Sequence, residues 1–153
     1  MIRLITSGRQ QKERTTGSFS KLGSWAFLAI EGTTTHYRYG STLHTSEHEL
    51  ALTAVLEALR GISSPSNVHI TVDNEYLMNG ATLWLHVWKN NGWKTRTNEV
   101  IPYKDLWNAL EVCTNFHQKV RWAQTHKFNK SKDEQFVEKL CSLAIQEASL
   151  GMQ

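Results

Sequence analysis

The chain has 153 residues, of which 40% are hydrophobic and 20% are charged, and its formal net charge is +3. This length suits one domain, and this balance excludes an intrinsically disordered chain. No apolar run approaches the ~18 residues of a membrane span, and the N-terminus lacks the apolar segment of a secretory signal. We therefore expect a single globular domain over residues 1–153 that does not associate with a membrane.

Basic and acidic residues are unevenly distributed. Residues 1–22 and 114–132 are rich in Lys and Arg, whereas most acids lie elsewhere. Basic segments around an acidic centre are typical of a protein that brings a polyanion to a metal site, and a solvated surface of mixed charge is the ordinary alternative. The two cysteines, Cys113 and Cys141, form no Cys-x-x-Cys motif, so we expect buried thiols in a reducing, cytoplasmic compartment.

The first half of the chain predicts a meander of strands and then one helix. Apolar and β-branched runs predict strands at 2–6, 25–31 and 35–40, with a polar loop at 9–24. Leu50, Ala54, Val55, Ala58 and Leu59 recur at helical spacing and predict a helix over 45–61, which Gly61 ends.

The second half predicts strands that alternate with helices. We expect strands at 68–73 and 120–124, and helices at 74–88, 103–118 and 132–148, with a basic, Trp-bearing segment after the first of these helices. The resulting order, β β β α β α α β α, indicates an α/β fold in which helices pack on the faces of a mixed sheet.

Three carboxylates stand where elements begin or end. Glu49 lies near the start of the first helix, Asp73 ends the fourth strand, and Glu138 lies in the first turns of the last helix. Strand ends and adjacent helices of such sheets converge on one edge, where ligands bind. Clustered carboxylates suit Mg²⁺, and two such ions could activate a water for attack on a phosphodiester.

Each carboxylate also has a purely structural explanation. Ser46 and Glu49 fit a capping box, Asp73 fits an ordinary N-cap, and Glu138 could be a solvated residue near the positive end of a helix dipole. Taken one at a time, these explanations are favoured over a catalytic role.

Taken together, the motifs resemble ribonuclease HI, including the ribonuclease H domains of retroviral reverse transcriptases. "LITSGR" resembles the first-strand motif Thr-Asp-Gly-Ser, "LGSWAFLAI" the second strand, and "HELALTAVLEAL" the Glu-bearing helix. "TVDNEYLMNGATLWLHVWKNNGWKT" is similar to the aspartate strand, the next helix and the basic handle of bacterial enzymes. "DLWNAL", "VRWAQTHK" and "DEQFVEKLCSLA" complete the series in register along nearly the whole chain.

The resemblance implies a ribonuclease H-like fold, a five-stranded mixed sheet in the order 3-2-1-4-5 with helices on both faces. It implies a monomeric endonuclease that hydrolyses the RNA strand of RNA–DNA hybrids with Mg²⁺ or Mn²⁺. Glu49 and Asp73 match the family's second and third acids, and Glu138 falls on the fourth, although a shift of one residue would place Val137 there. His126 matches a mobile histidine that assists proton transfer or product release.

The chain departs from the family pattern at its first acid. Ser7 stands where the family has the aspartate that bridges both metal ions, and a neutral hydroxyl cannot supply the missing charge. Either another group completes the metal shell or turnover is strongly reduced. Glu13 is the only other acid among the first 30 residues, and we do not expect it to substitute.

The resemblance also implies substrate contacts. Thr45 and Ser46 replace the family's Asn-Asn pair, and their hydroxyls could bond sugar or phosphate. The handle keeps its aromatic and basic residues, of which Lys89, Lys94 and Arg96 suit phosphate contacts. Its tryptophans, Trp84, Trp88 and Trp93, could bind substrate or belong to the core. Two functions therefore stay open. The first is cleavage of the RNA strand, and the second, which Ser7 supports, is a ribonuclease-H-like module that binds a hybrid without cutting it. A third, weaker hypothesis is a structural domain that uses the fold for protein contacts.

Overall fold

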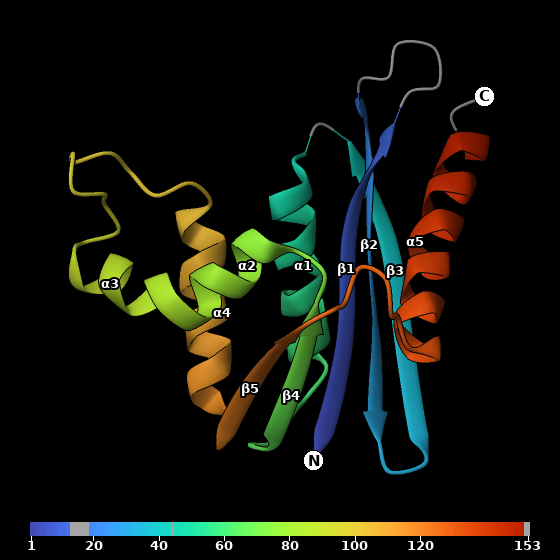
Figure 1. Ribbon diagram of the computed structural model, residues 1–153, viewed down its shortest axis with the longest axis horizontal. Helices are drawn as coiled ribbons and strands as arrows, with labels where there is room; N and C mark the ends of the chain where they lie inside the picture. The colour runs from blue at the N-terminus through green and yellow to red at the C-terminus, as the bar shows by residue number, and fades with distance from the viewer. Residues whose placement is uncertain (13–18, 44, 152–153) are drawn as a thin grey trace.

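The sheet runs through the centre of the molecule. The structure is a computed structural model that describes residues 1–12, 19–43 and 45–151. In this part of the chain, five strands pair in the order β3-β2-β1-β4-β5 (Figure 1). β1, β2 and β3 form the expected antiparallel meander, and β4 and β5 continue the sheet in parallel with β1. The strands are β1 (Ile2–Lys12), β2 (Phe19–Glu31), β3 (Thr34–Leu43), β4 (Asn67–Val72) and β5 (Lys119–Gln124).

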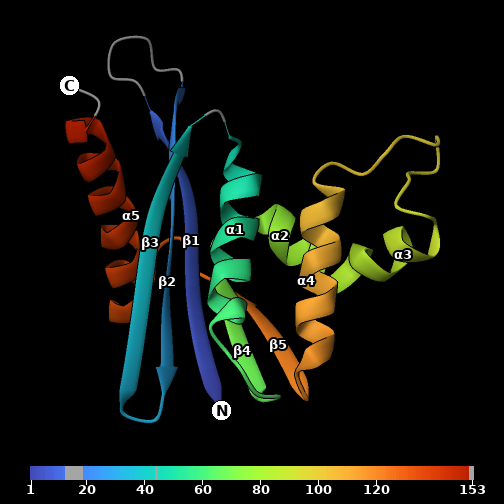
Figure 2. The same ribbon diagram turned by 180° about the vertical axis from the view of Figure 1, so that it is seen from behind.

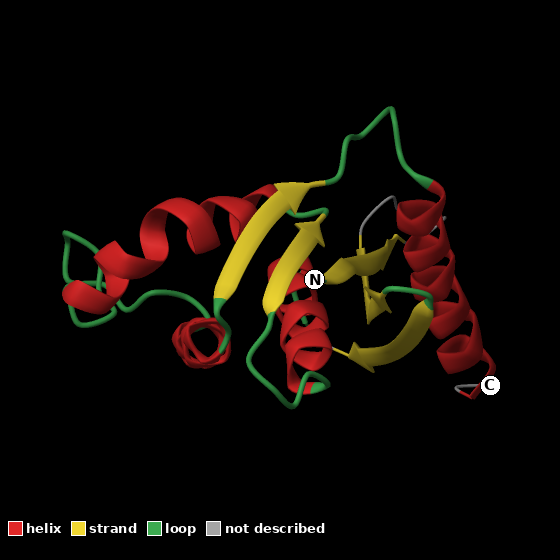
Figure 3. Ribbon diagram, turned by 90° about the horizontal axis from the view of Figure 1, so that it is seen from below, coloured by secondary structure: helices red, strands yellow, loops and turns green. Residues whose placement is uncertain are grey.

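Helices cover both faces of the sheet, as expected. α5 lies along β1, β2 and β3 on one face, whereas α1 packs on the other face and against α4 (Figures 2 and 3). The helices are α1 (Glu47–Arg60), α2 (Glu75–Asn79), the π-helical turn η1 (Gly80–Trp84), α3 (Leu85–Asn90), α4 (Lys104–Phe116) and α5 (Lys132–Gly151).

Alternation along β1 divides the core into two clusters. Leu4 points to the α1 face and joins a cluster that includes Val55 of α1 and Trp107 of α4. Ile5, its neighbour, points to the α5 face and packs with Val137. Successive side chains of a strand point to opposite faces, so the single strand β1 anchors both helical layers.

The first two strands are longer than predicted, and the expected loop over 9–24 is wrong in part. β1 continues to Lys12 and β2 already begins at Phe19, while residues 13–18, including Glu13, lie outside the described residues. The ladder pairs Gln10 with Gly23 and Lys12 with Phe19, with an irregularity between the two pairs. The sequence did not predict this extension, because the residues there are mostly polar. Backbone pairing can lengthen a hairpin without apolar side chains.

The helix predicted over 74–88 forms, but its middle is a π-helical turn. Gly80 opens this turn, and a Cβ built on it would lie 2.2 Å from the ring of Trp107. The absent side chain therefore lets Trp107 of α4 pack directly against the backbone, and the helix continues outward as α3.

Gly8 fixes the approach of α1 to β1. A Cβ at this position would lie 2.3 Å from the backbone nitrogen of Ala51. We expect Gly8→Ala to push α1 away from the sheet and to lower the free energy of unfolding by about 1–3 kcal/mol, as overpacking does. Urea denaturation measures this loss, and Gly32→Ala, at a position with open space but a φ of +61°, provides a comparison for backbone strain alone. Equal stability of Gly8→Ala and the wild type would contradict this packing.

Candidate active site

Two neighbouring parallel strands deliver Ser7 and Asp73 to one point. Ile5 pairs with Thr71, so the residues two places further along each strand, Ser7 and Asp73, lie side by side. The Ser7 hydroxyl, on a residue that is 3% exposed, donates a hydrogen bond of 2.5 Å to Oδ2 of Asp73. β1 thus brings the hydroxyl of Ser7 to the carboxylate of Asp73, which follows β4. The family that the sequence resembles has an aspartate at the position of Ser7.

Arg9 and Glu138 complete this cluster. Arg9 shares a strand face with Ser7, and its Nε donates to the Ser7 hydroxyl oxygen at 3.4 Å and lies 3.9 Å from Oδ2 of Asp73. Its Nη2 donates to Oε1 of Glu138, on α5, at 2.6 Å. Lys130, in the loop before α5, bonds the same oxygen of Glu138. Arg9 therefore faces both carboxylates, those of Asp73 and Glu138, and Glu138 is also paired with Lys130.

Burial dominates the proton affinity of Asp73. Desolvation raises the pKa of this carboxyl above its ordinary value, and the hydrogen bond from Ser7 and the charge of Arg9 offset this only in part. Beneath it, the thiol of Cys141 donates to the backbone carbonyl of Ser7 at 3.6 Å. Burial raises the pKa of this thiol to about 11, so it remains a neutral packing group.

Glu49 lies at the start of α1 and is held by local bonds. The Ser46 hydroxyl accepts from the backbone N–H of Glu49 at 3.1 Å, which confirms Ser46 as the N-cap. The hydroxyl of Thr45 donates to Oε2 of Glu49 at 2.7 Å, and that of Ser46 bonds the Tyr103 hydroxyl. Among the described residues, no hydrogen bond or ion pair joins Glu49 to the cluster around Asp73.

The structural alternatives for the other two acids do not hold. Asn74, not Asp73, caps α2, through its side chain and the N–H of Leu77. Glu138 is not a solvated helix-face residue, since its carboxylate is paired with Arg9 and Lys130. The neighbouring Val137 is 1% exposed and packs in the core, so the structure turns Glu138, rather than Val137, toward Asp73.

A pocket of about 420 Å³ opens beside this cluster. Its lining combines cations and carboxylates, and consists of Arg9, Glu47, Asp73, Glu75, Gln124, Thr125, Lys127 and Lys130. His126 is exposed between two of these lining residues, in the loop that follows β5. Because His126 is exposed, its predicted auxiliary role remains sterically possible.

The side chains of this cluster do not fit a centre of two divalent ions as they are arranged. Such a centre needs several carboxylates with uncompensated charge. Here Asp73 and Glu138 face Arg9 and Lys130, so their charges are balanced within the protein. In the described part of the chain, no three side chains from His, Cys, Asp and Glu are grouped so that they could hold a metal ion.

Some of the predicted residues of the handle are exposed, and others pack against the core. Lys94 and Arg96 are exposed and line an open groove after α3. Trp93 and Trp88 are partly buried against the core, where the Trp88 ring lies 5.2 Å from that of Trp107. Trp84 is 38% exposed, so only part of the predicted tryptophan face is core.

Lys89, predicted as a phosphate contact, is bonded to a buried acid. Its Nζ donates to Oε1 of Glu111 at 2.6 Å, and the Glu111 side chain is only 7% exposed. The other carboxylate oxygen of Glu111, Oε2, is buried and has no hydrogen-bond partner within residues 1–12, 19–43 and 45–151. The ammonium of Lys89 therefore compensates a carboxylate of α4 within the domain.

We expect Lys89→Met to destabilise the fold by roughly 1–3 kcal/mol, because it leaves the charge of Glu111 buried and unpaired. Lys94→Met, which removes an exposed cation of the same handle, is the matched control and should change stability by less than about 0.5 kcal/mol. Urea denaturation of both variants provides the comparison. Equal losses would show that Lys89 is not needed as a counter-ion.

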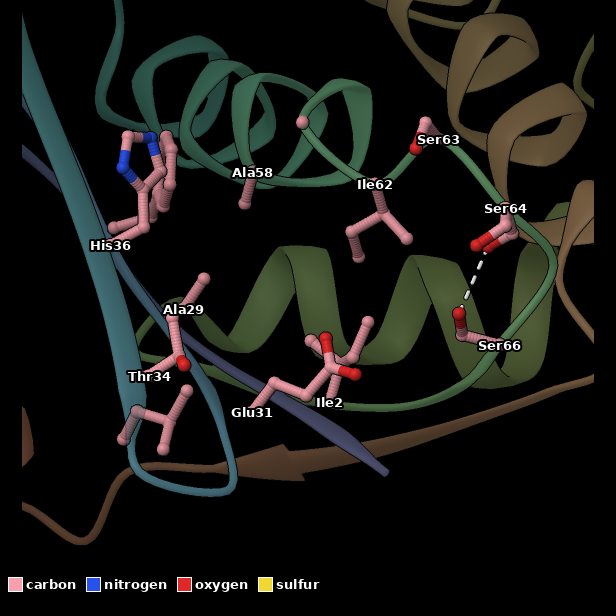
Figure 4. A pocket seen from close by; sticks show the side chains of 13 residues that line it. Ile2, Ala29, Glu31, Thr34, His36, Ala58, Ile62, Ser63, Ser64 and Ser66 are labelled. Carbon is pink, nitrogen blue, oxygen red and sulfur yellow. Dashed lines mark hydrogen bonds between the residues drawn. The ribbon is translucent and has the colours of Figure 1, made fainter.

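A second pocket, of about 280 Å³, lies at the other end of the sheet. Figure 4 shows it near the start of β1 and β4 and the end of α1, with Ile2, Ala58 and Ile62 among its lining residues. Its position is remote from Asp73, which follows the opposite end of β4. It is therefore separate from the carboxylate cluster.

Arg9 and Lys130 were not predicted as site residues. A signal for Arg9 was present, since it is two residues beyond Ser7 and must share its strand face. Lys130 had no comparable signal, because its place depends on the course of the loop before α5.

In the described residues, no helix is both long and apolar enough to cross a membrane.

Comparison with known proteins identifies the family to which this chain is similar. A family model described as RNase H matches residues 14–146. A ribonuclease H of Hydrogenovibrio crunogenus is 33% identical over 125 residues, which cover 82% of this chain and 86% of that protein. The family match begins beyond Ser7, so the place of Ser7 at the site comes from the fold.

Two solved structures share the fold. The type 1 RNase H LC9-RNase H1, described as carrying the type 2 active-site motif, superposes with a TM-score of 0.78 at 22% identity, over 95% of this chain and 72% of that one. The foamy viral protease-reverse transcriptase, solved with an RNA/DNA hybrid, gives 0.77 at 15% identity, over 94% of this chain and 20% of that one. From the family match and the relative together, we conclude that the chain belongs to the RNase H family.

Proposed function

We propose that this chain acts on RNA–DNA hybrids and hydrolyses their RNA strand endonucleolytically, at a rate that Ser7 and Arg9 hold low. The supporting observation is that Ser7, Asp73 and Glu138 are joined through Arg9 at a point beside the middle of β1 and the carboxyl end of β4. The RNase H family generally uses divalent metal ions, and we propose Mg²⁺, with Mn²⁺ as a substitute, for this chain.

The proposed metal ligands are Glu49, Asp73 and Glu138. Asp73 and Glu138 already lie in one cluster, but Glu138 would have to exchange Arg9 and Lys130 for a metal ion. Ser7 offers a hydroxyl in place of a charged ligand, which lowers the affinity for a divalent ion further. We therefore expect turnover only at high metal concentration, with His126 as the proposed auxiliary group.

The remaining predicted residues would hold the substrate. Lys94 and Arg96 are exposed and suit contacts to a phosphate backbone, with Trp93 beside them. Thr45 and Ser46 lie next to Glu49, where their hydroxyls could reach sugar or phosphate. Contacts of this kind select a hybrid by its shape and its 2′-hydroxyls and not by its sequence.

A second function, binding of a hybrid without cleavage, is favoured by one specific observation. The carboxylates of the cluster are balanced by Arg9 and Lys130, and the hydroxyl of Ser7 adds no charge. A domain with this centre could keep the nucleic-acid surface of the family after losing its hydrolytic rate.

Cleavage of an end-labelled RNA–DNA hybrid in Mg²⁺ and in Mn²⁺ separates the two functions. Internal cleavage of the RNA strand, lost in Asp73→Asn, supports hydrolysis; uncut hybrid that is shifted in a native gel supports binding alone. Single-stranded RNA and duplex DNA of the same sequence are the control substrates. A wild-type protein that neither cuts nor shifts the hybrid would contradict both functions.

The protein's surroundings are also part of the proposal. Its two thiols, Cys113 and Cys141, are both free, which suits a reducing cytoplasmic compartment. We propose that it acts there as a monomer, which size-exclusion chromatography tests directly.

A further inference from the structure

Two cations from distant parts of the chain converge at one carboxylate oxygen. Nη2 of Arg9 lies 2.6 Å from Oε1 of Glu138, and Nζ of Lys130 bonds the same oxygen. Arg9 comes from β1, and Lys130 comes from the loop before α5. The fold therefore places a guanidinium and an ammonium together at the point where the family resemblance expects metal ions.

These cations remain accessible. The side chain of Arg9 is 42% exposed and that of Lys130 is 27% exposed, and both line the pocket of about 420 Å³ beside Asp73. Ion pairs with this exposure contribute little to stability, so the fold alone does not require them. Lys127 lines the same pocket and adds a third positive charge.

Both side chains keep hydrogen-bond donors for a ligand. A guanidinium has five N–H donors in a planar fork that matches phosphate, and an ammonium has three. Nη1 of Arg9 has no partner among the described residues, while Nη2 and Nε face Glu138 and the Ser7–Asp73 pair. The carboxylates of Glu47 and Glu75 also line the pocket, so an anion would be held closest to Arg9 and Lys130.

We propose that Arg9 and Lys130 form a phosphate-binding site, which anchors a backbone phosphate of the nucleic acid without a divalent metal ion. Glu138 occupies this site in the free protein and is displaced when the phosphate arrives. The inference rests on the proposed function for the identity of the nucleic acid. When no divalent ion is bound, the protein's own cations thus hold the phosphate.

Binding of a fluorescent RNA–DNA hybrid, measured by polarisation in EDTA, tests this site. We expect the wild type to bind without metal and Arg9→Gln and Lys130→Gln each to weaken binding roughly tenfold, the loss of a hydrogen bond to a charged group. In a plot of log affinity against log salt concentration, the steepness of the slope should fall by about one, which is the contribution of one phosphate contact. Lys119→Gln, which removes an exposed cation at the start of β5, is the matched control and should bind as the wild type does.

Glu138→Gln gives the sharpest comparison, because only one of the two explanations predicts tighter binding. If Glu138 competes with phosphate for the two cations, its neutralisation should tighten binding several-fold in EDTA. If Glu138 instead acts through a bound metal, this variant should bind no better than the wild type. Circular dichroism confirms that each variant is folded.

The outcomes separate this inference from the function on which it rests. Unchanged affinity in Arg9→Gln and Lys130→Gln, or wild-type binding that appears only with Mg²⁺, would overturn the phosphate site and leave the proposed function standing. A wild-type protein that fails to bind the hybrid in either buffer would overturn both.

Discussion

Ser7→Asp should raise the rate of RNA-strand hydrolysis by at least a hundredfold, which corresponds to about 3 kcal/mol of transition-state stabilisation. The Ser7 oxygen lies 2.5 Å from Oδ2 of Asp73, so an aspartate here sets a second carboxylate beside the first. Two adjacent carboxylates repel each other unless a cation lies between them, and their charge then outweighs that of Arg9. Single-turnover cleavage of a labelled hybrid in Mg²⁺ measures the gain.

Ser7→Asn is the matched control, because asparagine has the size of aspartate without its charge. It should give no gain. A second readout is independent of catalysis: Mn²⁺ should raise the melting temperature of Ser7→Asp more than that of the wild type, since an ion bound to the native state stabilises it. If Ser7→Asp and Ser7→Asn cleave equally slowly, the cluster is not assembled as a metal centre.

Trp107→Ala should lower the free energy of unfolding by about 3–5 kcal/mol, the range for removal of a large buried aromatic side chain. Trp107 is fully buried, and its ring lies 5.2 Å from that of Trp88 and 5.7 Å from that of Tyr76. It also fills the space that Gly80 leaves open. The residue thereby connects α4 to the helix that carries the basic handle, and urea denaturation measures its contribution.

Phe128→Ala provides the control for the loss of an aromatic ring. Phe128 is 93% exposed, so its removal should change stability by less than about 0.5 kcal/mol. A loss below about 1 kcal/mol for Trp107→Ala would mean that the handle and α4 are not held together by this contact.

The order of elements and the class of fold could be predicted from the sequence. Helical spacing in residues 45–61 and the β-branched run ending at Asp73 are local signals, and α1 and β4 form where these signals occur. The resemblance supplied the strand order, which is the observed order. The polar stretch after Gly8 gave a wrong boundary, because the β1–β2 ladder is stabilised by backbone pairing that side-chain polarity does not report.

The sequence by itself also determined which chemistry could be present: three carboxylates where elements begin or end, a serine in the first strand, and basic segments around them. Only the tertiary structure decided that Arg9 and Lys130 turn inward onto Glu138, while Glu49 remains with Thr45. The physical reason is that charge compensation depends on distances of a few ångströms between side chains far apart in the chain. Packing of α1 and α5 on opposite faces of the sheet sets those distances, and no local pattern encodes them.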